Sequence, residues 1–155
     1  MEGAGDLAPL PEAGRGSSVS GASSSAAVLL LLASCSTSPT SPRAVNVGDR
    51  FTLATGQTAQ VEGTGLRVTF ESVSADSRCP VDVTCVWEGD AVVIVSLRPA
   101  SAGAAQHDLH TAGRYPSEAQ EGDYRVRLVD LAPAPRQGGS PRPGDYRATF
   151  VVARR

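Results

Sequence analysis

The sequence predicts an all-β protein, a single antiparallel β-sandwich or small barrel of about seven strands. Several segments alternate apolar and polar side chains with a period of two, which is the pattern of half-buried strands. Gly, Pro, Asp and Ser turn signals separate these segments, and no window has the periodicity of an amphipathic helix. Because parallel sheets need crossover connections that are usually helical, this pattern favours antiparallel pairing.

The segment at 91–97 gives the strongest strand signal. It reads Ala-Val-Val-Ile-Val-Ser-Leu and is apolar on both faces, which is typical of a central strand that is covered on both sides. Clear alternation predicts strands at 50–54, 66–70, 124–128 and 146–152, with weaker signals at 58–61 and 106–111. We expect one helical turn at 116–120.

The amino-terminal region does not have the pattern of a folded domain. It is rich in Gly, Ser and Ala and contains an apolar run at 26–33, within the ~7–15 residues of a secretory signal core and too short to span a bilayer. The run ends in Leu32-Ala33-Ser34-Cys35. This motif of an aliphatic residue, two small residues and Cys resembles the lipobox of bacterial lipoprotein precursors.

The lipoprotein resemblance implies how the chain is processed and where it resides. Residues 1–34 would be the signal peptide, and Cys35 would carry diacylglycerol and a fatty acid such as palmitate. A Ser/Thr/Pro tether at 35–44 would join this anchor to a β domain at 45–155. The expected location is the extracytoplasmic face of a cell membrane or outer membrane. The alternative is an apolar patch before a free cysteine in a cytosolic protein.

The number of cysteines agrees with export. There are three, an odd number that is unusual in a secreted chain. If Cys35 carries lipid, Cys79 and Cys85 remain and can form a disulfide in an oxidising compartment. Closing this small ring removes unfolded-state entropy worth about 2.4 kcal/mol.

The segment around these cysteines carries a second resemblance. It reads Ser-Arg-Cys-Pro at 77–80 and Cys-Val-Trp-Glu-Gly at 85–89. This pattern is similar to a family of secreted or lipid-anchored bacterial proteins that share Ser-Arg-Cys-Pro and Cys-x-Trp-x-Gly. The resemblance covers most of 45–155 and implies the β fold and the envelope location, but no activity.

Trp87 has two interpretations. In the structural one it packs on the Cys79–Cys85 disulfide, as a buried Trp does in immunoglobulin-like domains. In the functional one, Arg78, Trp87 and Glu88 are anchors of an exposed recognition loop, because Arg and Trp are favoured at binding hot spots. A redox dithiol is disfavoured, because active pairs have the spacing Cys-x-x-Cys.

The sequence predicts no metal site and no cofactor. His107 and His110 have an odd separation, so on a strand they face opposite sides of the sheet and are expected to be solvent-exposed. An acidic cluster near the cysteines lacks the alternating ligands of a calcium loop. Its members are Asp76, Asp82, Glu88 and Asp90.

No motif predicts catalysis or nucleic-acid binding. The chain has no Gly-x-Ser-x-Gly nucleophile motif and no lysine, which leaves no phosphate-binding loop ending in Lys. The net charge of −2 excludes nucleic-acid binding by bulk charge. No catalytic residue is assigned.

The sequence therefore predicts a lipid-anchored extracytoplasmic β protein that binds a partner or supports an envelope assembly, and that is not an enzyme. Its partners would be the membrane, through the lipid, and a protein or ligand of the cell envelope. Two alternatives remain. One is an inhibitor or receptor-type protein that presents the Cys79–Cys85 loop, and the other is an envelope enzyme with an unrecognised site.

Overall fold

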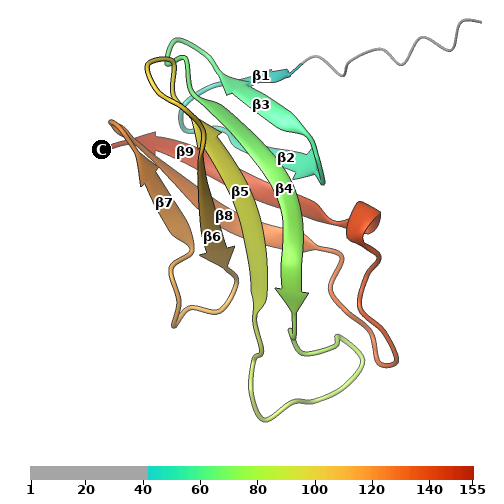
Figure 1. Cartoon of the computed structure of the whole chain (residues 1–155). Helices are drawn as coiled ribbons and strands as arrows, with labels where there is room; N and C mark the ends of the chain where they lie inside the picture. Colours follow the sequence, from blue (N-terminus) through green and yellow to red (C-terminus); the bar gives the residue numbers. More distant parts are fainter. Residues whose placement is uncertain (1–41) are drawn as a thin grey trace, which may run out of the picture. The chain divides into compact units, whose positions relative to one another are not determined.

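The computed structural model describes residues 42–155, an all-β unit with nine strands in two sheets (Figure 1). The predicted signal peptide, Cys35 and the tether up to Ser41 lie outside the described residues. The five-stranded sheet has the order β1 (Arg43–Val45), β3 (Thr58–Val61), β4 (Arg67–Asp76), β5 (Ala91–Arg98) and β6 (Ala105–His110). The four-stranded sheet has the order β2 (Arg50–Ala54), β9 (Arg147–Arg154), β8 (Tyr124–Ala132) and β7 (Glu118–Glu121).

The predicted all-β class is confirmed, and all seven expected strands are present. β1 and β7 bring the total to nine. β1 begins at Arg43, inside the segment that the sequence assigns to the tether, and it pairs in parallel with β3. All other strand pairs are antiparallel.

The prediction of a helical turn at 116–120 is wrong. Residues from Glu118 to Glu121 form β7, which pairs with β8. Ala119 lies opposite Val126, and both side chains are buried. Pairing with β8 satisfies the backbone groups of β7, which a single isolated helical turn would leave largely unpaired. Within the described residues the helical structure is one 3₁₀ turn, Pro143–Asp145, and no helix is long enough to cross a membrane.

The two sheets share one hydrophobic core. Phe70 of β4 and Phe150 of β9 are fully buried, and their ring centroids lie 6.3 Å apart in an edge-on arrangement that joins the sheets. Most other core residues are Val, Leu and Ala at alternating strand positions. The period-two pattern in the sequence therefore corresponds to the core-facing side of each sheet.

β5 is an interior strand, flanked by β4 and β6, as its apolar sequence predicts. Val93, Val95 and Leu97 face the core and are fully buried. On the opposite face only Ile94 is buried, while Val92 is half-buried. The expectation that both faces of β5 are covered is therefore wrong for most of its outer face.

Candidate functional site

Three connections lie at the same end of the two sheets, below the labelled strands in Figure 1. They are the β4–β5 connection at 77–90, which we call the Cys loop, the β6–β7 connection at 111–117 and the β8–β9 connection at 133–146. Loops carried on a rigid scaffold are common places for binding sites. This end of the molecule is the candidate functional site.

The predicted disulfide is confirmed. Cys79 and Cys85 are joined, and their Cα atoms lie 5.9 Å apart. Two backbone hydrogen bonds close the base of the Cys loop: Ser77 donates to the Asp90 carbonyl at 2.7 Å, and Cys79 donates to the Glu88 carbonyl at 3.1 Å. The disulfide and these bonds hold the loop in a defined shape.

Gly89 allows the two sides of the Cys loop to approach each other. Its φ is +67°, and a Cβ at this position would lie 1.9 Å from the carbonyl oxygen of Ser77. No side chain can be accommodated at that distance from a backbone atom. Glycine is therefore required here for the loop to close.

Arg78 is not the exposed anchor that the recognition hypothesis assumed. Its guanidinium pairs with Asp76 at 2.7 Å, and the side chain is only 14% exposed. The same guanidinium donates hydrogen bonds to the carbonyls of Leu131 and Pro133. Arg78 therefore connects the Cys loop of one sheet to the end of β8 in the other.

Asp76 accepts the bonds that complete this connection. It receives bonds from the Arg78 side chain and backbone, and the Tyr146 hydroxyl donates to it at 3.0 Å. Burial by itself would raise the pKa of Asp76, but these bonds and the Arg78 charge outweigh burial and lower the pKa. Burial and the Asp76 carboxylate together raise the pKa of Tyr146 to about 12.

The structural interpretation of Trp87, in which it packs as a buried side chain, is wrong. Trp87 is 76% exposed, and its neighbours Val86 and Val81 are 90% and 63% exposed. Figure 1 shows the Cys loop extending beyond the ends of β4 and β5, away from the two sheets. Val81, Val86 and Trp87 are therefore exposed apolar side chains on the Cys loop, and we call these three residues the apolar tip.

The β8–β9 connection is hydrogen-bonded to the Cys loop near this tip. The Val81 amide donates to the Pro135 carbonyl at 3.1 Å, and the Gln137 amide donates to the Asp82 carboxylate at 2.7 Å. Asp82 and Glu88 are both exposed and give the tip an acidic border. Of the three predicted recognition residues, the structure exposes Trp87 and Glu88 and uses Arg78 as a brace.

The sequence analysis missed a second feature at this end, a pair formed by Asp90 and His110. The carboxylate of Asp90 lies 2.6 Å from Nδ1 of His110. It also accepts bonds from the Thr111 amide and hydroxyl and from the Ala112 amide. Burial by itself would raise the pKa of Asp90, but these bonds lower it. Twenty residues separate Asp90 from His110, so no local motif indicates the pair.

Neither histidine is fully solvent-exposed, which corrects that expectation. The side chains of His107 and His110 are 28% and 21% exposed. They do face opposite sides of β6, since His107 contacts Glu121 of the other sheet and His110 contacts Asp90, the last residue of the Cys loop before β5. Among residues 42–155, no three His, Cys, Asp or Glu side chains are grouped so that they could hold a metal ion.

A hollow of about 320 Å³ lies beside the Asp90–His110 pair. His110, Arg78, Ser117 and Asp130 contribute to its lining. The ring of His110 packs against Tyr115, with ring centroids 4.8 Å apart. The hydrogen bonds of Asp90 hold the start of the β6–β7 connection in place. The lining of the hollow includes polar side chains.

Arg78 thus connects the Cys loop to the end of β8, and Asp90 connects it to the start of the β6–β7 connection. Comparison with protein-family models, curated proteins and solved structures found no match for the chain.

Proposed function

We propose that this protein is a lipid-anchored β-sandwich of a bacterial envelope that binds a partner protein through the tip of its Cys loop. The observation that carries the proposal is the 76% exposure of Trp87 on a loop fixed by a disulfide. We define the recognition surface as Val81, Val86, Trp87 and Glu88. The membrane anchor would be Cys35, on the strength of the lipobox sequence.

The apolar area of the exposed tip determines how much free energy its burial could contribute to binding a partner. A Trp buried at an interface removes about 150–250 Å² from water, worth roughly 4–6 kcal/mol before costs. Association itself costs on the order of 4–15 kcal/mol. Trp87 therefore needs the additional apolar area of Val81 and Val86. A loop that is already rigid loses little further conformational entropy on binding.

The chemistry of the surface defines the partner. Trp87 and Val86 suit an apolar pocket, and the exposed carboxylates of Asp82 and Glu88 suit a basic border around that pocket. A receptor that is held at the membrane and an inhibitor that inserts its loop into another protein would both use this surface. Both versions place Trp87 at the centre of the contact.

Site-specific cross-linking tests the recognition surface. A photoreactive amino acid replaces Val86, and the cross-linking is carried out in the cell envelope. It should give one discrete cross-linked product with the partner protein. Trp87→Ala should abolish the product because it removes the central anchor, and Glu88→Gln should reduce it by weakening contact with a basic border. The matched control is the same photoreactive residue at Gln106, an exposed position on β6. Identical products at both positions, or a product that Trp87→Ala leaves unchanged, would contradict the proposal.

A second candidate is an envelope enzyme that uses the polar hollow. The specific observation is the Asp90–His110 pair, because a carboxylate on Nδ1 leaves Nε2 of an imidazole free to move protons. Ser117 lines the same hollow. His110→Asn and Trp87→Ala distinguish the candidates: turnover of an envelope substrate lost only with His110→Asn supports the enzyme, and cross-linking lost only with Trp87→Ala supports the binding protein.

A further inference from the structure

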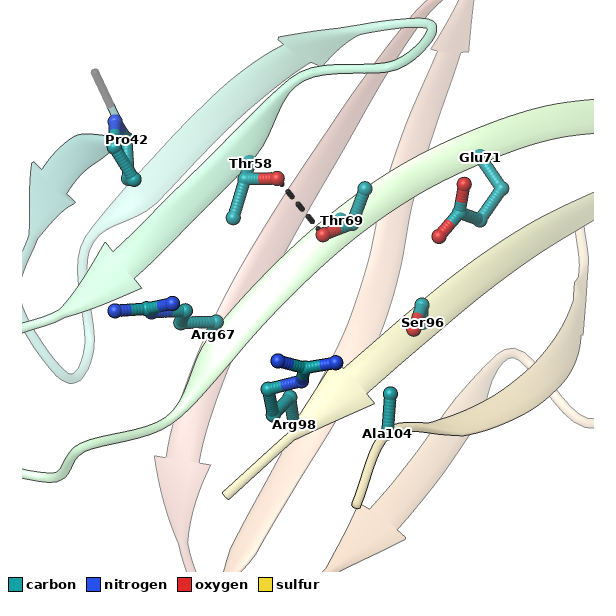
Figure 2. A pocket seen from close by; sticks show the side chains of 8 residues that line it. All are labelled: Pro42, Thr58, Arg67, Thr69, Glu71, Ser96, Arg98 and Ala104. Carbon is teal, nitrogen blue, oxygen red and sulfur yellow. Dashed lines mark hydrogen bonds between the residues drawn. The ribbon is translucent and has the colours of Figure 1, made fainter. Parts of the chain in front are cut away.

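The outer face of the five-stranded sheet carries a groove of about 310 Å³ whose lining includes no residue of the Cys loop (Figure 2). β3, β4 and β5 provide most of its walls. The lining residues are Pro42, Thr58, Arg67, Thr69, Glu71, Ser96, Arg98 and Ala104.

Arg67 and Arg98 stand directly opposite each other in this groove. They are register partners in the antiparallel pair of β4 and β5, and both side chains are exposed. Like charges at directly opposite positions destabilise a sheet. Within residues 42–155, neither guanidinium has a carboxylate within ion-pair distance, whereas Arg78, Arg125 and Arg142 each have one. Among the described residues, neither of these two positive charges is therefore part of an ion pair.

Hydrogen bonds fix the orientation of the Arg67 side chain in the groove. The Nε of Arg67 donates to the Gln60 side chain at 2.8 Å, and the Gln60 amide in turn donates to the Leu66 carbonyl at 3.4 Å. This leaves the terminal nitrogens of Arg67 available to a ligand. A second hollow of about 400 Å³ is also lined by Arg67 and Arg98, so the arginine pair lies where the two hollows meet.

Hydroxyl groups lie next to the arginine pair. Thr58 and Thr69 share a hydrogen bond of 2.8 Å, drawn as the dashed line in Figure 2. One hydroxyl of such a pair donates, and the proton of the other remains free for a third group. Figure 2 shows the two guanidinium groups toward one end of the groove and the Glu71 carboxylate toward the other.

We propose that this groove binds a phosphate group carried on a polyol, with the phosphate on Arg67 and Arg98 and a polyol hydroxyl on Glu71. Two guanidinium groups match the oxygens and charge of a phosphate. The free threonine proton adds a further donor, and Glu71 at the other end offers only acceptors at neutral pH. A simple anion would gain nothing from Glu71, whereas a polyol hydroxyl can donate to it.

A polyol phosphate can come from a soluble ester or from a lipid headgroup. Pro42 lines the groove and follows Cys35 by seven residues, which span at most about 25 Å of extended chain. If Cys35 carries lipid, as proposed above, the groove is within reach of a bilayer surface. Only this membrane source rests on the proposed anchor; the phosphate chemistry does not.

The test uses the full chain with Cys35→Ser, so that no lipid anchor contributes. Calorimetric titration with glycerol 3-phosphate should show saturable binding, and Arg67→Gln or Arg98→Gln should weaken the affinity at least tenfold. Arg127→Gln is the matched control, because Arg127 is exposed on β8 and lies outside the groove. Absence of binding in this titration and in the vesicle assay below, or an equal loss with Arg127→Gln, would overturn the proposal.

Two further measurements are needed. One tests the contact of the polyol with Glu71, and the other identifies the source of the phosphate. Glu71→Gln should lower the preference for glycerol 3-phosphate over inorganic phosphate; an unchanged preference would overturn the assignment of the polyol. Co-sedimentation with phosphatidylglycerol vesicles, compared with phosphatidylcholine vesicles, tests the lipid headgroup. Retention on phosphatidylglycerol that depends on Arg67 and Arg98 supports the membrane source, and titration without retention supports the soluble one. Because the protein is unlipidated, neither result depends on the anchor.

Discussion

Trp87 and Phe150 are large aromatic side chains in opposite environments, and substitution should separate their roles. Trp87 is 76% exposed and Phe150 is fully buried. We expect Trp87→Ala to change the free energy of unfolding by less than about 0.5 kcal/mol, as is usual for surface substitutions. Phe150→Ala should cost about 3–5 kcal/mol, because it leaves a cavity where the sheets meet. Denaturant unfolding of both variants measures the difference, and a large loss with Trp87→Ala would show that the side chain packs.

Asp76 should make stability depend on pH in the acid range. Its pKa is lowered from the ordinary value of 3.8, so the ionised carboxylate stabilises the folded state. This contribution is present above the unfolded pKa and is lost as the pH falls through the folded pKa. Asp76→Asn should cost toward the lower end of about 3–5 kcal/mol at pH 7, because Arg78 keeps two carbonyl acceptors.

The pH profile distinguishes this ion pair from a simple packing effect. The difference in free energy of unfolding between wild type and Asp76→Asn should shrink as the pH is lowered from about 5 to below 3. Asp108→Asn, at an exposed position on β6, is the control and should leave the profile unchanged. A wild-type-to-Asp76→Asn difference that stays constant over this range would show that the charge of Asp76 does not matter.

At the scale of the strands, the arginine pair on β4 and β5 gives a prediction with an unusual sign. Arg98→Gln removes one of two like charges at directly opposite positions. In phosphate-free buffer we expect the variant to be more stable than wild type by about 0.2–1 kcal/mol. The melting temperature measures this gain, which high salt should reduce by screening the repulsion. A loss of stability would mean that Arg98 makes favourable contacts with its surroundings.

The strands were largely predictable because their signal is local. Phe51 and Leu53, like Leu66, Val68 and Phe70, are buried at the alternating positions that the sequence shows. β7 was missed because a strand of four residues has too few positions to show a period, and its pairing with β8 decides its conformation. Two short strands thus account for the difference between the expected and observed strand numbers.

The site was less predictable because its contacts are long-range. Nothing near Arg78 in the sequence indicates that its guanidinium reaches carbonyls 53 and 55 residues away. The exposure of Trp87 depends on where the ends of β4 and β5 stand relative to the second sheet, which residue types alone do not specify. The disulfide was the exception, because two cysteines close in sequence had few alternatives once Cys35 was set aside.

At the scale of the whole molecule, two surfaces are available on one rigid unit. The Cys loop extends from one end of the sheets, and the arginine groove lies on the outer face of the five-stranded sheet, where Pro42 is part of its lining. If Cys35 carries lipid, as proposed, the groove face that includes Pro42 would be available to the lipid surface. The loop at the strand ends would then remain free for a partner protein.

Lipid attachment at Cys35 can be tested directly. The four residues Leu32-Ala33-Ser34-Cys35 match the lipobox pattern. Each buried methylene of an acyl chain would add about 0.8 kcal/mol of membrane affinity. One acyl chain holds weakly, and two or more hold stably. The wild-type protein from cells should therefore enter the detergent phase on phase partition, and Cys35→Ala should stay in the aqueous phase. The control is the Cys79→Ala/Cys85→Ala double variant, which loses the disulfide but keeps Cys35 and should still enter the detergent phase. Wild-type protein that remains aqueous with an intact amino terminus would show that Cys35 is not an anchor.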